Sequence, residues 1–245
     1  WTGHREARLV VVGAGPCGLA VLARIVRDCR EAGADAGPVV ASTVVVDPRG
    51  DWLGAWDAKL GAQRVAHLRS PTFVHPHPSR AVDDELLRFA RSSPAWAGHL
   101  KPVHATATGE WRAPSAQLFR AFCAHVARSH GLEGCVHRGE VVDIQRHPSG
   151  PGLVVTLRDG RTVGTRAAVL AVGPGLAPAV PSWARPLLAL PGGRVEHVSA
   201  PHGSLCGQRD RDWDVDWPVA RWIAARARAL LRRAIGPHRP RERLL

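Results

Sequence analysis

A short motif near the N-terminus constrains the fold of this chain more than any other feature. Residues 8–20 read RLVVVGAGPCGLA, in which the apolar run Leu9–Val12 is followed by glycines at positions 13, 15 and 18. A continuous apolar run is typical of a strand that is buried on both faces. The next segment, Leu19–Arg30, repeats apolar residues at helical spacing. We therefore expect a strand, a glycine-rich turn and a helix in direct succession.

The spacing of the three glycines has a physical reason. Gly13 permits the tight turn out of the strand, and Gly15 lets the backbone approach a pyrophosphate closely. Gly18 lets the helix pack closely against the preceding strand. The free N–H groups and the positive dipole end of that helix face the phosphates. The motif therefore predicts a dinucleotide-binding turn.

An acidic residue at the end of the next predicted strand strengthens this interpretation. Val39–Val46 is apolar and β-branched, and Asp47 terminates it. In dinucleotide folds a carboxylate at this point accepts hydrogen bonds from the adenosine ribose. Asp47 lies further from the glycines than the usual spacing of about 20 residues, and the Gly-containing break at 32–38 accounts for the excess. The alternative is that Asp47 only ends a turn before Pro48.

The remaining segments predict an α/β fold, with a Rossmann-like parallel sheet, helices and a small antiparallel β-meander. Residues 1–190 form the expected nucleotide-binding domain, with an irregular insert and helices at 49–116 and the meander at 135–165. In order, we expect an irregular segment at 49–80, a helix at 83–91, a loop at 93–111, a helix at 117–129, strands at 135–136 and 141–145, a hairpin at 153–163 and a strand at 167–172.

Composition and charge exclude several classes of protein. The formal net charge is +12, but only two of the 33 basic residues are lysines, and the arginines are scattered without a nucleic-acid-binding module. No apolar stretch approaches the roughly 18 residues of a membrane span. The five cysteines are widely separated, which favours the cytoplasm. His75 and His77 flank a proline without other ligands at suitable spacing, so we expect no metal site.

Together these segments resemble the FAD-binding half of flavin-dependent monooxygenases, a group that includes lysine/ornithine N-hydroxylases, flavin-containing monooxygenases and Baeyer–Villiger relatives. The likeness covers roughly residues 8–183. GAGPCG is similar to the family motif G-x-G-P-x-G, and DWLGAW at 51–56 is similar to the segment after the ribose ligand. HLRSP at 67–71 looks like the loop beside the flavin. LAVGP at 170–174 is similar to the A-T-G motif that ends the family's FAD domain.

The resemblance implies FAD as the cofactor and assigns its contacts. The residues expected to cradle the phosphates are Gly13, Ala14, Gly15, Pro16, Cys17 and Gly18. The residues expected along the rest of the cofactor are Asp47 and Pro48 at the ribose, Val141 at the adenine, Trp52, Trp56, Arg69 and Ser70 near the flavin, and Gly173 with Pro174 at the domain exit. No catalytic residue is assigned.

The chain departs from the family after this point. A second glycine motif, for NADPH, is expected within a few tens of residues, but the sequence turns Arg-rich after Gln208. We therefore expect residues 191–245 to be a remnant or aberrant tail, with a frame disruption or alternative end near Gln208. The absence of Met also predicts a fragment or an incomplete gene product.

Three functions stay open on the sequence. The first is a flavin-dependent oxidoreductase, for which the resemblance implies that NADPH and O₂ would oxygenate a small-molecule substrate in the complete enzyme. The second is a non-catalytic, truncated dinucleotide-binding protein with an interaction or regulatory role. The third, a single-domain NAD(P)-dependent dehydrogenase, is disfavoured by the long insert and the meander. The substrate and the oligomeric state are not predicted.

Overall fold

A computed structural model describes residues 1–79, 83–106 and 109–173, together with positions 182 and 186. In chain order the elements are β1 (His4–Val12), α1 (Pro16–Glu31), α2 (Gly37–Ala41), β2 (Thr43–Asp47), α3 (Gly54–Ala62), α4 (Glu85–Arg91), a 3₁₀ helix (Pro94–Trp96), β3 (Leu100–Thr106), β4 (Gly109–Pro114), α5 (Ala116–Ser129), β5 (Val136–Arg138), β6 (Val141–Arg146), β7 (Leu153–Leu157) and β8 (Thr162–Leu170). The second compact unit, Gly207–Leu245, and the predicted tail at 191–245 lie outside the described residues.

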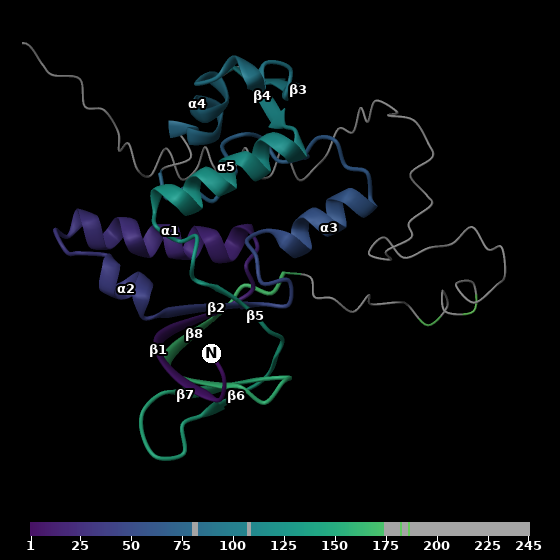
Figure 1. The fold of residues 1–245 in the computed structure, drawn as a ribbon. Coiled ribbons are helices and arrows are strands. Elements are labelled where there is room, and N and C mark those ends of the chain that lie inside the picture. The colour runs from purple at the N-terminus through teal and green to yellow at the C-terminus, as the bar shows by residue number, and fades with distance from the viewer. Residues whose placement is uncertain (80–82, 107–108, 174–181, 183–185, 187–245) are drawn as a thin grey trace, which may run out of the picture. The chain divides into compact units, whose positions relative to one another are not determined.

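A six-stranded sheet organises the first unit, with strand order β5-β2-β1-β8-β7-β6 (Figure 1). Strands β5, β2, β1 and β8 run parallel, whereas β8, β7 and β6 are antiparallel neighbours. The predicted Rossmann-like α/β fold is therefore confirmed. The carboxyl ends of β1 and β2 lie side by side, since Val12 pairs with Val46.

Alternating side chains of β1 and β2 face two separate cores. Val11 and Val45 belong to the core under the helices, a buried cluster that also includes Leu22 of α1 and Phe122 of α5. Val10, with its neighbours on the same face, belongs to a second core on the opposite face of the sheet. Because both faces are covered, these strands read as continuous apolar runs instead of alternating ones.

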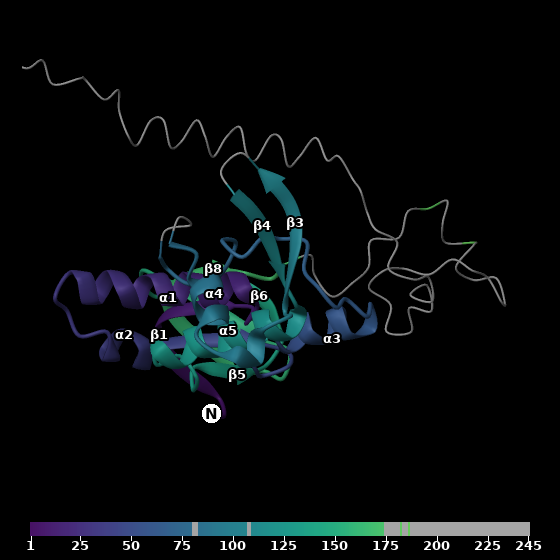
Figure 2. The same ribbon diagram turned by 90° about the horizontal axis from the view of Figure 1, so that it is seen from above.

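The helices lie in layers over one face of the sheet. Figure 1 shows α1 next to the sheet and α5 above it, with α4 and the β3–β4 hairpin further out. The inward face of α1 is Leu19, Leu22, Ala23 and Val26, and all four side chains are buried. Seen from above, the hairpin projects away from this layer (Figure 2).

The antiparallel strands fold back onto the sheet. Val155 and Leu157 of β7 share a buried cluster with Val44 and Val46 of β2, although two strands separate β7 from β2 in the sheet. A Cβ at Gly139 would lie 3.3 Å from the side chain of Val46 and collide with that of Leu157. This close packing brings the β7–β8 turn beside the end of β2.

Five expected segments differ in the structure. The predicted strand at 39–46 begins as helix α2, because Pro38 suits a first helical turn, and Ser42 Oγ closes the turn by donating to the Pro38 carbonyl at 2.7 Å. The expected loop at 93–111 contains the β3–β4 hairpin, where an irregularity beside Pro102 hides the strand period. The irregular segment at 49–80 contains α3, and the strands expected at 162–163 and 167–172 are the single strand β8.

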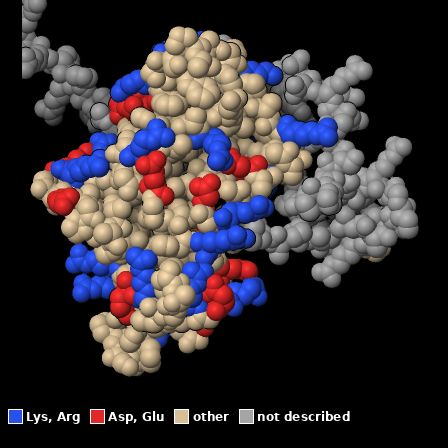
Figure 3. All heavy atoms as spheres, in the orientation of Figure 1, with Lys and Arg blue, Asp and Glu red and all other residues tan. Residues whose placement is uncertain are grey.

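Charged side chains are mixed on the face shown in Figure 3, where Lys and Arg alternate with Asp and Glu. Several arginines have an acidic partner within their own helix, such as Arg24 with Asp28 at 2.7 Å and Arg27 with Glu31 at 2.6 Å. The net positive charge is therefore partly offset locally. Among the described residues, no helix is long and apolar enough to cross a membrane.

Histidines cluster in the helical layer around Phe122. The ring of His77 lies 5.7 Å from that of His130 and 6.1 Å from that of His75. The pKa of His77 is lowered to about 4, mainly by burial and in smaller part by the neighbouring charges of His130, His75 and Arg27. The pKa values of His75 and His130 are also lowered, mainly by burial. The folded domain therefore holds these imidazoles in their neutral form.

We predict that acid destabilises the domain through this cluster. A histidine whose pKa is lower in the folded state binds more protons when unfolded, so its stabilisation is lost as pH falls from about 6.5 toward 4. Urea unfolding at each pH measures the effect. Over this range the free energy of unfolding falls less for His77→Gln than for wild type. The difference is on the order of 1 kcal/mol, a small value because the ring is only half-buried. His147→Gln is the control. In both histidines, Nδ1 accepts a hydrogen bond from the backbone N–H of the residue two positions later in the chain. Equal pH dependence in all three proteins would contradict the prediction.

Candidate dinucleotide-binding site

The glycine turn leaves β1 as the sequence predicts. Gly13 adopts φ 106°, which is favourable only for glycine, and its N–H donates to the carbonyl of Val46 at 2.8 Å. A Cβ at Gly13 would collide with the carbonyl oxygen of Ala171. Gly13 thus joins the ends of three parallel strands, β1, β2 and β8, where dinucleotide folds bind their ligand.

The other two glycines differ in what surrounds them. A Cβ at Gly18 would collide with the carbonyl oxygen of Gly13, so helix α1 contacts the turn at this position. A Cβ at Gly15 would meet nothing within 4 Å, and its φ of −80° suits any residue. Gly15 is therefore not required by the fold itself. It leaves open space where a phosphate could approach the backbone.

The start of α1 is available to an anion. Pro16 occupies the first turn, Gly15 precedes the helix, and no side chain caps its N-terminus. Cys17, in the same turn, is exposed. Uncapped N–H groups and the helix dipole favour a negatively charged group here.

Asp47 is buried at the end of β2, and its carboxylate holds two backbone segments. Its Oδ2 accepts a hydrogen bond from the N–H of Ala14 at 3.0 Å, and its Oδ1 accepts one from the N–H of Arg49 at 2.8 Å. Each carboxylate oxygen has a further lone pair. Asp47 therefore sets the position of the glycine turn and retains acceptor capacity for ribose hydroxyls.

The turn before α3 is fixed to the same loop. The N–H of Leu53 donates to the carbonyl of Ala14 at 2.8 Å, and Leu53 adopts φ 62°, an uncommon value for a non-glycine residue. Trp52 is buried, and its Nε1 donates to the carbonyl of Leu132 at 2.8 Å. Trp56 is half-buried against Phe119, with ring centroids 5.1 Å apart. Trp52 thus has a structural role in the helical layer, and flavin packing by either tryptophan stays a prediction.

The end of β8 completes the site on its other side. The N–H of Ala171 donates to the carbonyl of Val12 at 2.8 Å, and two residues later Gly173 is exposed with φ 63°. The predicted domain exit is therefore adjacent to the glycine turn. Pro174 lies outside the described residues.

The predicted flavin-side residues occupy a separate segment. Arg69 and Ser70 are exposed. Residues on either side of them form backbone hydrogen bonds to β4: the N–H of Leu68 donates to the Pro114 carbonyl, and the N–H of Thr72 donates to the Arg112 carbonyl. These bonds place the segment beside the hairpin. Contact with a flavin stays a prediction for both residues.

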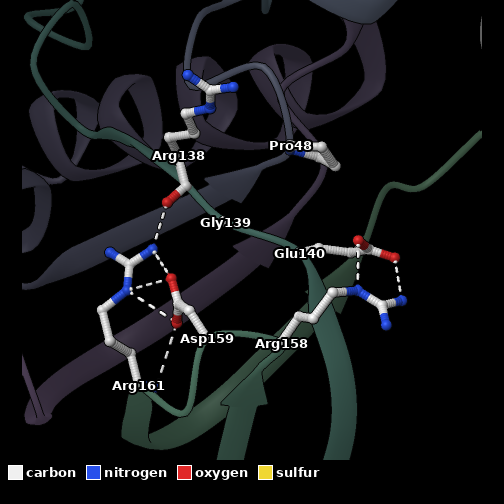
Figure 4. Close-up of a pocket in the computed structure, with 7 residues that line it drawn as sticks. All are labelled: Pro48, Arg138, Gly139, Glu140, Arg158, Asp159 and Arg161. Atoms are coloured by element: carbon white, nitrogen blue, oxygen red, sulfur yellow. Dashed lines mark hydrogen bonds and ion pairs between the residues drawn. The ribbon is translucent and has the colours of Figure 1, made fainter.

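An open cleft of about 610 Å³ lies beside the end of β2, and sequence reasoning missed most of its lining. It is bounded by Pro48, the 138–140 segment and the β7–β8 turn (Figure 4). Val141, predicted near the adenine, begins β6 directly after this segment and pairs with Leu157. The N–H of Gly139 donates to the Asp47 carbonyl at 3.0 Å. Segments roughly 90 residues apart in sequence form this cleft, so no local pattern could have indicated it.

The residues present fit a dinucleotide. The open space at Gly15, the uncapped helix N-terminus and the spare acceptors of Asp47 meet at one edge of the sheet. Within the described part of the chain, no group of three His, Cys, Asp or Glu residues is arranged to hold a metal ion.

Comparison with known proteins agrees with this geometry. A family model described as FAD-NAD(P)-binding matches residues 10–175, which is most of the chain and includes the glycine turn, Asp47 and the end of β8. No curated protein sequence matches the chain.

Solved structures of flavoenzymes are similar to part of this chain. A flavin-containing monooxygenase from Stenotrophomonas maltophilia is 23% identical, with a TM-score of 0.40, and the match covers 68% of this chain and 38% of that protein. A cyclohexanone monooxygenase mutant from Rhodococcus sp. Phi1, bound to NADP⁺, is 15% identical, with a TM-score of 0.47 and coverages of 73% and 28%. A bacillithiol disulfide reductase from Staphylococcus aureus is 14% identical, with a TM-score of 0.38 and coverages of 69% and 39%. The chain thus spans well under half the length of each.

We predict opposite outcomes for substitutions of two glycines in the turn. Gly18→Ala places a methyl group against the Gly13 carbonyl and lowers the free energy of unfolding by about 2 kcal/mol or more. Gly15→Asn puts its side chain into open space at a helix N-cap, where Asn is favoured, and changes stability by less than about 1 kcal/mol. Urea unfolding without cofactor measures both. Equal losses for the two variants would contradict the assigned roles.

Proposed function

The chain belongs to the FAD-NAD(P)-binding family, and from this premise we propose that its nucleotide site holds FAD as part of a flavin-dependent oxidoreductase of the monooxygenase type. The observation that carries the proposal is that two elements of the site form hydrogen bonds to the backbone of Ala14. Its N–H bonds to the ribose candidate Asp47, and its carbonyl bonds to Leu53, in the segment that resembles the flavin-packing part of the family. Phosphate, ribose and flavin-side elements are thereby held together.

The chain's own residues bind and orient the cofactor in this proposal. The first turn of α1 donates N–H groups to the diphosphate, and Asp47 accepts from the ribose. Trp56 of α3, which is half-buried, would limit the access of water to one side of the flavin. FAD, when bound, supplies the electron-transfer and oxygen chemistry, with NADPH as the reductant in the complete enzyme.

The substrate side of the proposal is broader. A small molecule with a nucleophilic nitrogen, sulfur or carbon centre is the expected substrate class, as the resemblance implies. Cys29, Cys123 and Cys135 are free thiols, which supports a reducing compartment such as the cytoplasm.

We predict that the purified full chain binds FAD. The expected result is flavin absorption near 450 nm, roughly the position of a bound flavin, and release of FAD on denaturation. Gly15→Asp lowers FAD affinity by about 100-fold, because its carboxylate faces the diphosphate, and Gly15→Asn has a smaller effect. Isothermal titration of FAD into the apoprotein measures both.

Two outcomes would count against the proposal. A colourless protein that takes up no added FAD and binds NAD(P)H instead would favour the dehydrogenase reading. Equal FAD affinity for Gly15→Asp, Gly15→Asn and wild type would show that the diphosphate does not lie at this turn.

A further inference from the structure

The cleft beside β2 contains a fixed, flat guanidinium group. Arg158, directly after β7, donates from Nε to Glu140 Oε2 and from a terminal nitrogen to Glu140 Oε1, both at 2.7 Å. The Arg158 N–H also donates to the Glu140 carbonyl at 2.8 Å. Figure 4 shows this pair on one side of the cleft, below Pro48, with Arg161 and Asp159 on the other side. Three bonds therefore set the orientation of this side chain.

The other arginines of the cleft are arranged differently. Arg161 is held by Asp159 and by the carbonyl of Arg138, at 2.9 Å and 2.5 Å. Figure 4 shows the Arg138 side chain directed away from this network. Arg161 is also bound by a carboxylate, but its guanidinium carbon lies over the Trp1 ring, 4.6 Å from the ring centroid. Arg158 is fixed along one edge by Glu140, lines the cleft and has an exposed side chain.

The ion pair contributes little to the fold. The side chains of Arg158 and Glu140 are 68% and 43% exposed, and exposed ion pairs add little to stability. The hydrogen bond from Arg158 lowers the pKa of Glu140, so both groups stay charged at neutral pH. Because the two charges offset each other, the pair attracts a phosphate only weakly. A flat, polarisable ring is the better ligand for the face of a guanidinium group.

The cleft lies next to the ribose candidate through Pro48. Pro48 lines the cleft and directly follows Asp47, whose carbonyl accepts the N–H of Gly139 in the opposite wall. For a nucleotide with its diphosphate at α1 and its ribose at Asp47, the cleft beside Pro48 is the neighbouring open space that could hold the base. We propose that Arg158, held flat by Glu140, is the surface on which the adenine ring stacks, and that it determines affinity for the adenosine end of the cofactor. This inference rests on the proposed function.

The test measures binding instead of turnover. FAD, ADP and FMN are titrated into the full-length apoprotein by calorimetry, with wild type, Arg158→Ala and Arg158→Lys. Both variants lose about three- to tenfold in affinity for FAD and for ADP, because lysine keeps the charge but not the plane. The weaker binding of FMN, which has no adenine, is unchanged. Arg166→Ala is the control, since Arg166 is an exposed arginine of β8 outside the cleft.

The outcomes separate this inference from the proposed function. If wild type binds FAD and ADP and both Arg158 variants bind them equally well, the inference is overturned and the FAD proposal stands. Full rescue by Arg158→Lys would also overturn it, since charge alone would then explain the effect. Wild-type protein that binds neither FAD nor ADP would contradict the proposed function itself. Unchanged thermal unfolding of the variants, expected for an exposed pair, excludes misfolding as the cause.

Discussion

The backbone of Ala14 is the constraint on which the candidate site depends. Its N–H is bound by the buried carboxylate of Asp47, and its carbonyl accepts from Leu53. A buried carboxylate without hydrogen bonds is costly, so the Asp47 bonds favour one arrangement of the turn over others. The ends of β1 and β2 and the start of α3 are thereby fixed to each other before any ligand binds. Preorganisation of this kind lowers the entropic cost of binding.

The glycine turn could be predicted from the sequence because its causes are local. Gly13 needs its positive φ, and Gly18 contacts the carbonyl of Gly13 only five residues earlier. The buried strand and the helix on either side follow from apolar periodicity over a few residues. For Asp47, the sequence predicted a ribose ligand at a strand end, and the structure adds that the same carboxylate holds the turn.

Other parts of the fold could not be predicted because competing local effects decide them. Val39 and Val40 favour a strand, but Pro38 and Ser42 close a helical turn around them. In β3, Pro102 has no N–H and the pairing shifts beside it, so the strand pattern is lost. Trp52 resembles a cofactor contact in sequence, whereas only the fold shows its indole bonded to Leu132, 80 residues away.

The two ends of the candidate site therefore differ in how they are built. The phosphate end is one continuous segment, and any change there acts on β1, α1 and the turn together. The cleft at the other end joins residues near positions 48, 140 and 158 through single backbone bonds, Gly139 to Asp47 and Arg158 to Glu140. Exposed side chains on such a frame can change without loss of the core behind them, because Val46 and Leu157 hold the strands in place. Under the proposed function, diphosphate binding follows from the fold, while recognition of the base depends on a few exchangeable residues.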